Sequence, residues 1–124
     1  MAKLYEARDG KMVPVQTSKA PNAHLMFSWV QRVYIGSNNK THRVELKKIV
    51  NFFTNTLGIK GFTLFKTLGY FEGKPEKSVV VEIVGTLPNG KLINSKNIEN
   101  LRILLGQYSI IVATSKLWYM SVEK

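Results

Sequence analysis

Three glutamates lie in one apolar segment of this 124-residue chain, the run GYFEGKPEKSVVVEIVG at 69–85, although the whole chain has eight acidic residues. They are Glu72, Glu76 and Glu82. A carboxylate in such a segment can bind a cationic group of a ligand, or it can form an ion pair within a sheet. Glu76 follows a glycine and proline turn beside Tyr70, where a side chain can meet a ligand without being buried. Glu76 is therefore either a solvated turn charge or an acid that meets a ligand or a neighbouring subunit, and the sequence leaves both open, while Glu72 is expected to be a solvated turn residue.

Glu82 has two possible roles. If the hairpin turns about Lys74, cross-strand pairing places Glu82 opposite Lys66, and Ser78 opposite Tyr70. In that register Glu82 forms a surface ion pair worth a few tenths to ~1 kcal/mol. The other interpretation is that Glu82 faces a ligand, and the sequence leaves both open.

Composition argues against several kinds of catalytic centre. The chain has no cysteine and two histidines, His24 and His42, so disulfides, thiol nucleophiles and cysteine- or histidine-rich metal sites are not expected. Its one aspartate, Asp9, lies in the N-terminal segment, which leaves no convincing hydrolytic triad. The glycine segments match neither the Walker pattern nor the dinucleotide fingerprint. We therefore expect no metal, no cofactor and no nucleotide hydrolysis.

The net charge of +10 indicates a surface that attracts nucleic acid, nucleotides or an acidic protein. The basic residues are scattered, so the expected binding to nucleic acid is weak and without sequence preference. An RNA-recognition motif is disfavoured, because Lys60-Gly61-Phe62 falls on the second predicted strand and the third has no aromatic residue. The charged N-terminal start and the lack of a long apolar run predict a cytoplasmic protein without membrane contact.

The apolar pattern predicts four strands. Alternation indicates strands at 24–35, 61–71, 78–85 and 108–120, with the second and third joined by a turn at 72–77. The second and third strands are therefore expected to form a hairpin, with one strand before it and one after it in the chain.

Two helices are predicted between these strands. Spacings of three and four indicate a first helix that Thr41 caps, with His42 in its first turn and Gly58 at its end. A second helix is predicted to begin after a cap at Asn94 or Ser95 and to end at Gly106. Its inward residues are expected to be Ile98, Leu101, Leu104 and Leu105.

Together these elements predict an α+β fold, a ferredoxin-like βαββαβ sandwich whose four-stranded antiparallel sheet carries both helices on one face. The domain is expected to span 23–124, after a tail or docking segment at 1–22. Val80 and Val84 leave apolar side chains on the uncovered face of the sheet, which monomers rarely expose over a large area. A homo-oligomer, expected to be a trimer, would bury this face.

The hairpin GYFEGKPEKSV at 69–79, followed after the second helix by QYSIIV at 107–112, resembles the bacteriophage enzymes that degrade S-adenosylmethionine, the S-adenosylmethionine lyases. Members of that family are ferredoxin-like trimers with active sites between subunits, and they release methylthioadenosine and homoserine lactone. The resemblance implies a phage protein that deprives host restriction systems of their cofactor. It implies that Glu76 and Tyr70 are catalytic, that Gln107, Glu82 and Ser78 bind substrate, and that Glu82 is the alternative counterpart of the family's glutamate.

A second interpretation stays open. Similar hairpins occur in uncharacterised phage proteins and in trimeric nitrogen-regulatory signal proteins, which bind nucleotides without turning them over. The alternative is therefore a non-catalytic phage-type protein that binds a nucleotide, nucleic acid or a host defence factor through its positive surface.

Overall fold

The computed structural model describes residues 4–8, 11–15 and 23–122. They belong to two compact units, one formed by Trp29–Ser115 and the other by Met1–Ser28 with Lys116–Lys124. In the second unit, β1 (Leu4–Arg8) and β2 (Lys11–Val15) form an antiparallel hairpin. The predicted boundary at residue 22 stays a prediction, and residues 16–22 of the predicted tail lie outside the described part of the chain.

The other four strands form one sheet in the order β4-β5-β3-β6. Its strands are β3 (Ala23–Ile35), β4 (Thr63–Phe71), β5 (Lys74–Val84) and β6 (Ile111–Val122). The central strand β5 pairs antiparallel with both β3 and β4. The predicted succession of strand, helix, strand, strand, helix and strand is confirmed.

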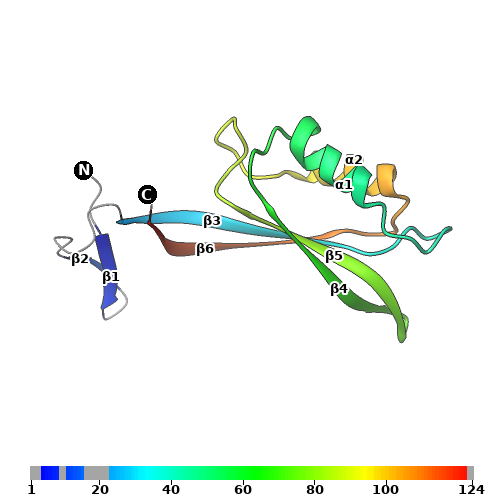
Figure 1. Cartoon of the computed structure of the whole chain (residues 1–124), viewed down its shortest axis with the longest axis horizontal. Coiled ribbons are helices and arrows are strands. Elements are labelled where there is room, and N and C mark those ends of the chain that lie inside the picture. The colour runs from blue at the N-terminus through cyan, green and yellow to red at the C-terminus, as the bar shows by residue number, and fades with distance from the viewer. Residues whose placement is uncertain (1–3, 9–10, 16–22, 123–124) are drawn as a thin grey trace. The chain divides into compact units, whose positions relative to one another are not determined.

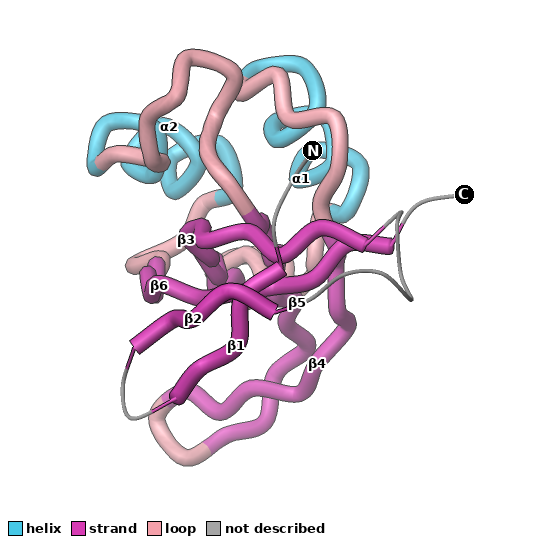
Figure 2. Tube along the Cα trace, turned by 90° about the vertical axis from the view of Figure 1, so that its left-hand side faces the viewer, coloured by secondary structure: helices cyan, strands magenta, loops and turns pink. Residues whose placement is uncertain are grey.

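The helices lie on one side of this sheet, as Figures 1 and 2 show. They are α1 (Leu46–Asn51), which continues into the π-helical turn η1 (Phe52–Thr56), and α2 (Ser95–Leu105). Burial alternates along β5, where Val79, Val81 and Ile83 are buried against the helices. The fully buried Phe53 and Leu101 meet them from the helix side and complete the core.

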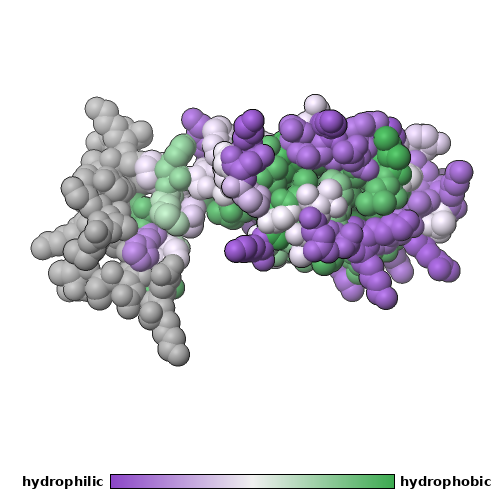
Figure 3. Space-filling model, turned by 90° about the horizontal axis from the view of Figure 1, so that it is seen from above, coloured by the Kyte–Doolittle hydropathy of each residue, from purple (hydrophilic) through white to green (hydrophobic). Residues whose placement is uncertain are grey.

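The second helix follows its sequence signals. Asn94 accepts a hydrogen bond from the backbone N–H of Asn97 at 2.9 Å, and the Asn97 side chain accepts from the Asn94 N–H at 3.1 Å, which forms a capping box. Gly106 ends the helix with φ +61. Leu101 and Leu105 are buried as predicted, but the prediction for Leu104 is wrong, because 43% of this residue is exposed. From the helix side of the molecule, Figure 3 shows hydrophilic side chains around an apolar area.

The predicted start of the first helix is wrong. The helix begins at Leu46 rather than after Thr41, and His42 lies in a loop with φ +59. The side chain of Asn38 explains the difference, because its Oδ1 accepts hydrogen bonds from the backbone N–H groups of Lys40 at 2.8 Å and Thr41 at 3.1 Å. Such local bonds compete with helix formation.

The predicted hairpin register is also wrong. The connection is not 72–77 but the two residues Glu72 and Gly73, both with positive φ, +50 and +75. A two-residue turn of this kind matches the twist of the strands, and it shortens the loop. Lys66 consequently lies opposite Val79, and Glu82 opposite Thr63. Glu76 lies within β5 rather than in the turn.

The sheet face away from the helices carries apolar side chains. Tyr34, Phe65, Val84 and Ile111 are between 42% and 64% exposed. Val80 lies between Tyr34 on β3 and Phe65 on β4 in the pairing register. The apolar face predicted from Val80 and Val84 is therefore present.

The unit that contains the ends of β3 and β6 has an aromatic cluster of its own. The rings of Phe27 and Trp118 are 4.9 Å apart between centroids, and the Lys116 ammonium lies 5.5 Å from the Phe27 ring. The Tyr119 hydroxyl donates to the Met26 sulfur at 3.9 Å. Across the part of the chain that the structure describes, no helix has the length and apolar content needed to cross a membrane.

Candidate functional site

Glu76 lies next to two glycines, Gly69 on β4 and Gly36 just after the end of β3. It lies directly opposite Gly69 on β4, and its Oε2 accepts a hydrogen bond from the Ser37 hydroxyl at 3.0 Å. Its Oε1 lies 2.6 Å from the position that a Cβ of residue 36 would occupy. A side chain at position 36 would push the Glu76 carboxylate out of this place, so the glycine lets the carboxylate lie close to the backbone. The end of β3 thus fixes where the charge of Glu76 lies.

Gln107 adds a second oxygen beside this carboxylate. The residue is buried, with 7% exposure, and its Nε2 donates to the carbonyl oxygens of Gly36 at 2.9 Å and Ser37 at 2.6 Å. Its Oε1 lies 3.3 Å from the same Cβ position that Glu76 approaches. Two acceptor oxygens, one of them charged, therefore converge above Gly36. Such a pair suits a cationic donor such as an ammonium group.

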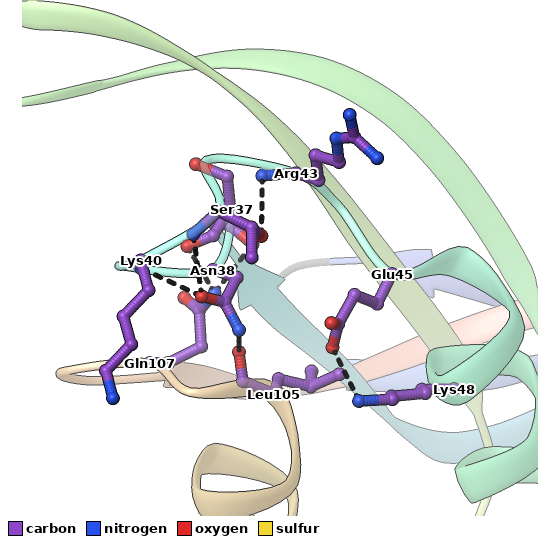
Figure 4. Close-up of polar contacts among 10 residues, drawn as sticks. Ser37, Asn38, Lys40, Arg43, Glu45, Lys48, Leu105 and Gln107 are labelled. Carbon is purple, nitrogen blue, oxygen red and sulfur yellow. Dashed lines mark hydrogen bonds and ion pairs between the residues drawn. The ribbon is translucent and has the colours of Figure 1, made fainter.

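The loop after β3 is held against the end of α2, which keeps this arrangement in place. Asn38 Nδ2 donates to the Leu105 carbonyl at 3.1 Å, and the backbone N–H of Asn39 donates to the Gly106 carbonyl at 3.1 Å. Figure 4 shows Asn38 and Gln107 pointing toward each other's loops, with the Arg43 side chain directed away from them.

Arg102 supports Gln107 from the helix. Its Nη1 donates to the Gln107 carbonyl at 3.0 Å, and it also pairs with Glu99, with Nη2 and Oε1 2.6 Å apart. The hydrogen bond from Arg102 holds the pKa of the exposed Glu99 carboxyl below its usual value. The charged pair keeps the Arg102 guanidinium oriented toward the loop that carries Gln107.

A pocket of about 230 Å³ surrounds the Glu76 carboxylate on this side of the sheet. We call it the aromatic pocket, because Tyr34, Phe71 and Tyr108 contribute to its lining; Tyr70 also borders it, but its side chain faces the other side of the sheet. Among the described residues that line it, Glu76 is the one charged residue. Phe71 and Tyr108 lie nearly parallel, with 18° between their planes and 6.4 Å between centroids. A negative charge framed by aromatic rings favours a cationic ligand with a planar group.

The predicted residues Ser78 and Tyr70 lie on either side of this centre. Ser78 lies two residues after Glu76 on the same face of β5, and its hydroxyl is 2.7 Å from that of Thr67 across the strand pair. Tyr70 lies opposite Pro75, so the alternation of the strand turns its side chain to the other face from Glu76. Tyr70 is 69% exposed. The roles predicted for both residues stay predictions.

Glu82 has a partner that the sequence did not indicate. Its Oε2 lies 2.8 Å from Nε of Arg32, the residue opposite it on β3, so the predicted ion pair with Lys66 is wrong. The reason is that β5 lies between β4 and β3. The register predicted for the hairpin considered only partners on β4, whereas the partner of Glu82 lies on β3. Six residues along an extended strand separate Glu82 from Glu76 by about 20 Å. Glu82 is not among the residues that line the aromatic pocket.

Four residues of the site were not predicted from the sequence, namely Gly36, Ser37, Phe71 and Tyr108. Gly36 and Ser37 end the first long strand, and Tyr108 directly follows the predicted Gln107. The composition around them is that of an ordinary loop, and their proximity to Glu76 depends on the pairing of β3 with β5. The described residues contain no group of three or more histidine, aspartate or glutamate side chains that could hold a metal ion.

Comparison with known proteins gives one similar structure to report. No protein-family model matches the chain, and no curated protein matches it. A solved structure of a phage S-adenosylmethionine lyase in complex with S-methyl-5'-thioadenosine is similar to it, with 18% sequence identity and a TM-score of 0.43. The match covers 77% of this chain and 90% of that chain. The resemblance stated from the hairpin and QYSIIV motifs is to the same kind of protein, and as a loose resemblance it is confirmed.

Proposed function

We propose that this protein is a lyase that degrades S-adenosylmethionine to methylthioadenosine and homoserine lactone. The observation that carries the proposal is the aromatic pocket, in which Glu76 is the one charged residue among the described lining residues. S-adenosylmethionine has a sulfonium, an ammonium group and a planar adenine, and the pocket offers a carboxylate and aromatic rings for these groups. The type of reaction, an intramolecular lyase step, is proposed from the resemblance of the hairpin at 69–79 and of QYSIIV at 107–112 to the lyases.

The reaction needs no external nucleophile. The substrate's own carboxylate oxygen forms a bond to its γ-carbon while the bond from that carbon to sulfur breaks, and the electron pair of the broken bond stays on sulfur. No proton is transferred, and the positive sulfonium and negative carboxylate become two uncharged functional groups. The protein accelerates such a step by holding the substrate folded and by excluding water from the opposite charges.

Glu76 is proposed to bind the substrate ammonium through Oε1, with Gln107 Oε1 as the second acceptor. Oε2 of Glu76 is already occupied by Ser37, and Nε2 of Gln107 by two carbonyl groups, so each side chain presents one remaining oxygen. Phe71 and Tyr108 are proposed to contact adenine or the sulfonium. Ser78, on the same face of β5 as Glu76, is proposed to bind substrate. The catalytic role expected for Tyr70 is not proposed for this pocket, because the Tyr70 side chain faces the other side of the sheet. Glu82 is proposed to form an ion pair with Arg32 rather than to contact substrate.

A homotrimer is proposed to complete the site. The volume of the aromatic pocket, about 230 Å³, is below the roughly 300–1,000 Å³ that pockets for small molecules usually have. A second copy against the apolar sheet face could close it and bury the exposed Tyr34 and Ile111. The strand order and the helices on one face support the ferredoxin-like sandwich that such a trimer would use.

The corresponding biological role would be counter-defence. Removal of S-adenosylmethionine from the cytoplasm of a host cell would deprive methyltransferases and restriction systems of their cofactor. The proposal is tested by incubating the purified protein with S-adenosylmethionine and separating the products by chromatography. Methylthioadenosine and homoserine lactone are expected in equal amounts, and the absence of both would overturn the enzyme proposal.

The alternative, a non-catalytic binding protein, is favoured by a different observation. A second groove next to the aromatic pocket is lined by Arg43, Lys66 and Lys77. A cationic substrate would be repelled there, whereas an anionic ligand would be attracted. Binding of an anionic ligand without any turnover of S-adenosylmethionine would support this second function.

A further inference from the structure

The largest groove among the described pockets has a volume of about 900 Å³ and lies between the β4–β5 hairpin and the loop before α1. We call it the basic groove. Its floor includes Val79 and Pro75 of β5, and Val44 and Leu46 line the opposite wall. The volume is within the range of roughly 300–1,000 Å³ that small-molecule sites occupy.

Cationic side chains line both sides of this groove. Lys66 and Lys77 come from the hairpin, and Arg43 from the loop. Lys66 lies opposite Val79, two residues from Lys77, so the lysines are diagonal neighbours on one face of the strand pair. Residues in that relation have Cα atoms about 7–8 Å apart. One phosphate group can therefore contact both ammonium groups.

These charges lack acidic partners within the part of the chain that the structure describes. The three ion pairs found there join Arg32 with Glu82, Lys48 with Glu45, and Arg102 with Glu99. The one acidic residue that lines the basic groove is Glu76, and its carboxylate accepts a hydrogen bond from Ser37. Three permanent positive charges against one carboxylate leave the groove positive at neutral pH, opposite in sign to the aromatic pocket.

We propose that the basic groove is a binding site for phosphate groups, those of a nucleotide or of a single-stranded nucleic acid backbone. Lys66 and Lys77 bind one phosphate from the hairpin side, and Arg43 approaches from the loop. The apolar floor accommodates the sugar or base. The site goes beyond the proposed lyase activity, because the proposed substrate has no phosphate. The groove borders the aromatic pocket, since Glu76 and Ser78 line both, but Arg43, Lys66 and Lys77 line the groove and not the aromatic pocket.

The test is a binding titration with a fluorescently labelled oligonucleotide of twelve thymidines, and with ATP as competitor. The variant combines Lys66→Gln with Lys77→Gln, and its charge-matched control combines Lys60→Gln with Lys91→Gln, two exposed lysines outside the groove. We expect the groove variant to bind the oligonucleotide at least about tenfold more weakly and to reduce the slope of log affinity against log salt by about 1.4, about 0.7 for each lysine on a single strand. The control should change the affinity less than about twofold.

Each result decides the proposal. Displacement of the oligonucleotide by micromolar ATP identifies a nucleotide site, and displacement only by unlabelled oligonucleotide identifies a nucleic acid backbone site. Equal weakening in both double variants, or no binding by the unmodified protein, overturns the proposal. If the double variant fails to fold, Arg43→Gln tests the site from the opposite wall. The titration does not depend on turnover of S-adenosylmethionine, so its failure is distinct from failure of the lyase proposal.

Discussion

Replacement of Glu76 by glutamine removes one negative charge and little else. The carboxylate and the amide have nearly the same shape, and the glutamine oxygen can still accept the hydrogen bond from Ser37. Its new amide group would lie near Gln107 Oε1, since both side chains approach the same point above Gly36. An amide donor there can form a hydrogen bond where two oxygens now meet. The thermal midpoint of the variant should therefore stay the same or rise slightly.

The functional loss should be much larger than the change in stability. A hydrogen bond to a charged group contributes about 1.5–3 kcal/mol, which corresponds to a loss of roughly ten- to 150-fold in kcat/KM. The substrate ammonium keeps its charge throughout the reaction, so its bond to Glu76 is present both before and in the transition state. We therefore expect most of the loss in KM rather than in kcat.

The assay measures methylthioadenosine formation over a range of S-adenosylmethionine concentrations. The matched control is Glu72→Gln, which removes the same charge from the exposed turn of the same hairpin. Activity within about twofold of the unmodified protein in Glu76→Gln would refute the reasoning. So would an equal loss in both variants, because net charge rather than position would then explain it.

Three further predictions concern Gly36, the ion pair of Glu82 and the oligomeric state. Gly36→Ala should displace the Glu76 carboxylate, whose Oε1 would be 2.6 Å from the new Cβ, and so lower kcat/KM for S-adenosylmethionine. The thermal midpoint should change little, because the end of a flexible side chain can move aside. Gly61→Ala, with no atom within 4 Å of its Cβ, should change neither quantity, and equal kcat/KM values for the two variants would contradict this prediction. Glu82→Gln should change stability by at most ~1 kcal/mol and preserve turnover, since its ion pair is partly exposed; loss of product formation would mean that Glu82 is the functional acid. The unmodified protein should have the mass of a trimer in light scattering, and Phe65→Glu on the uncovered face should lower that mass. A monomer at micromolar concentration would remove the basis for a site between subunits.

Local signals were sufficient for much of the fold. The capping box of Asn94 and Asn97 and the glycine at 106 delimit α2 within the chain itself, because caps act over three or four residues. The alternation in β5 likewise predicted which valines are buried. Glu76 and Gln107 were selected from the motif, and the structure brings them together above Gly36.

Tertiary structure decided what those residues contact. The register of the hairpin depended on a turn in which Glu72 adopts positive φ, a conformation that no sequence signal at a glutamate indicates. Arg32 is the partner of Glu82, and Ser37 that of Glu76, because β3 pairs with β5; the two contacts join residues 50 and 39 positions apart in the sequence. The sequence thus determined the succession of strands and helices, because caps and apolar alternation act between residues that are near one another in the chain. The charge environment of each acid was decided by strand pairing between distant segments.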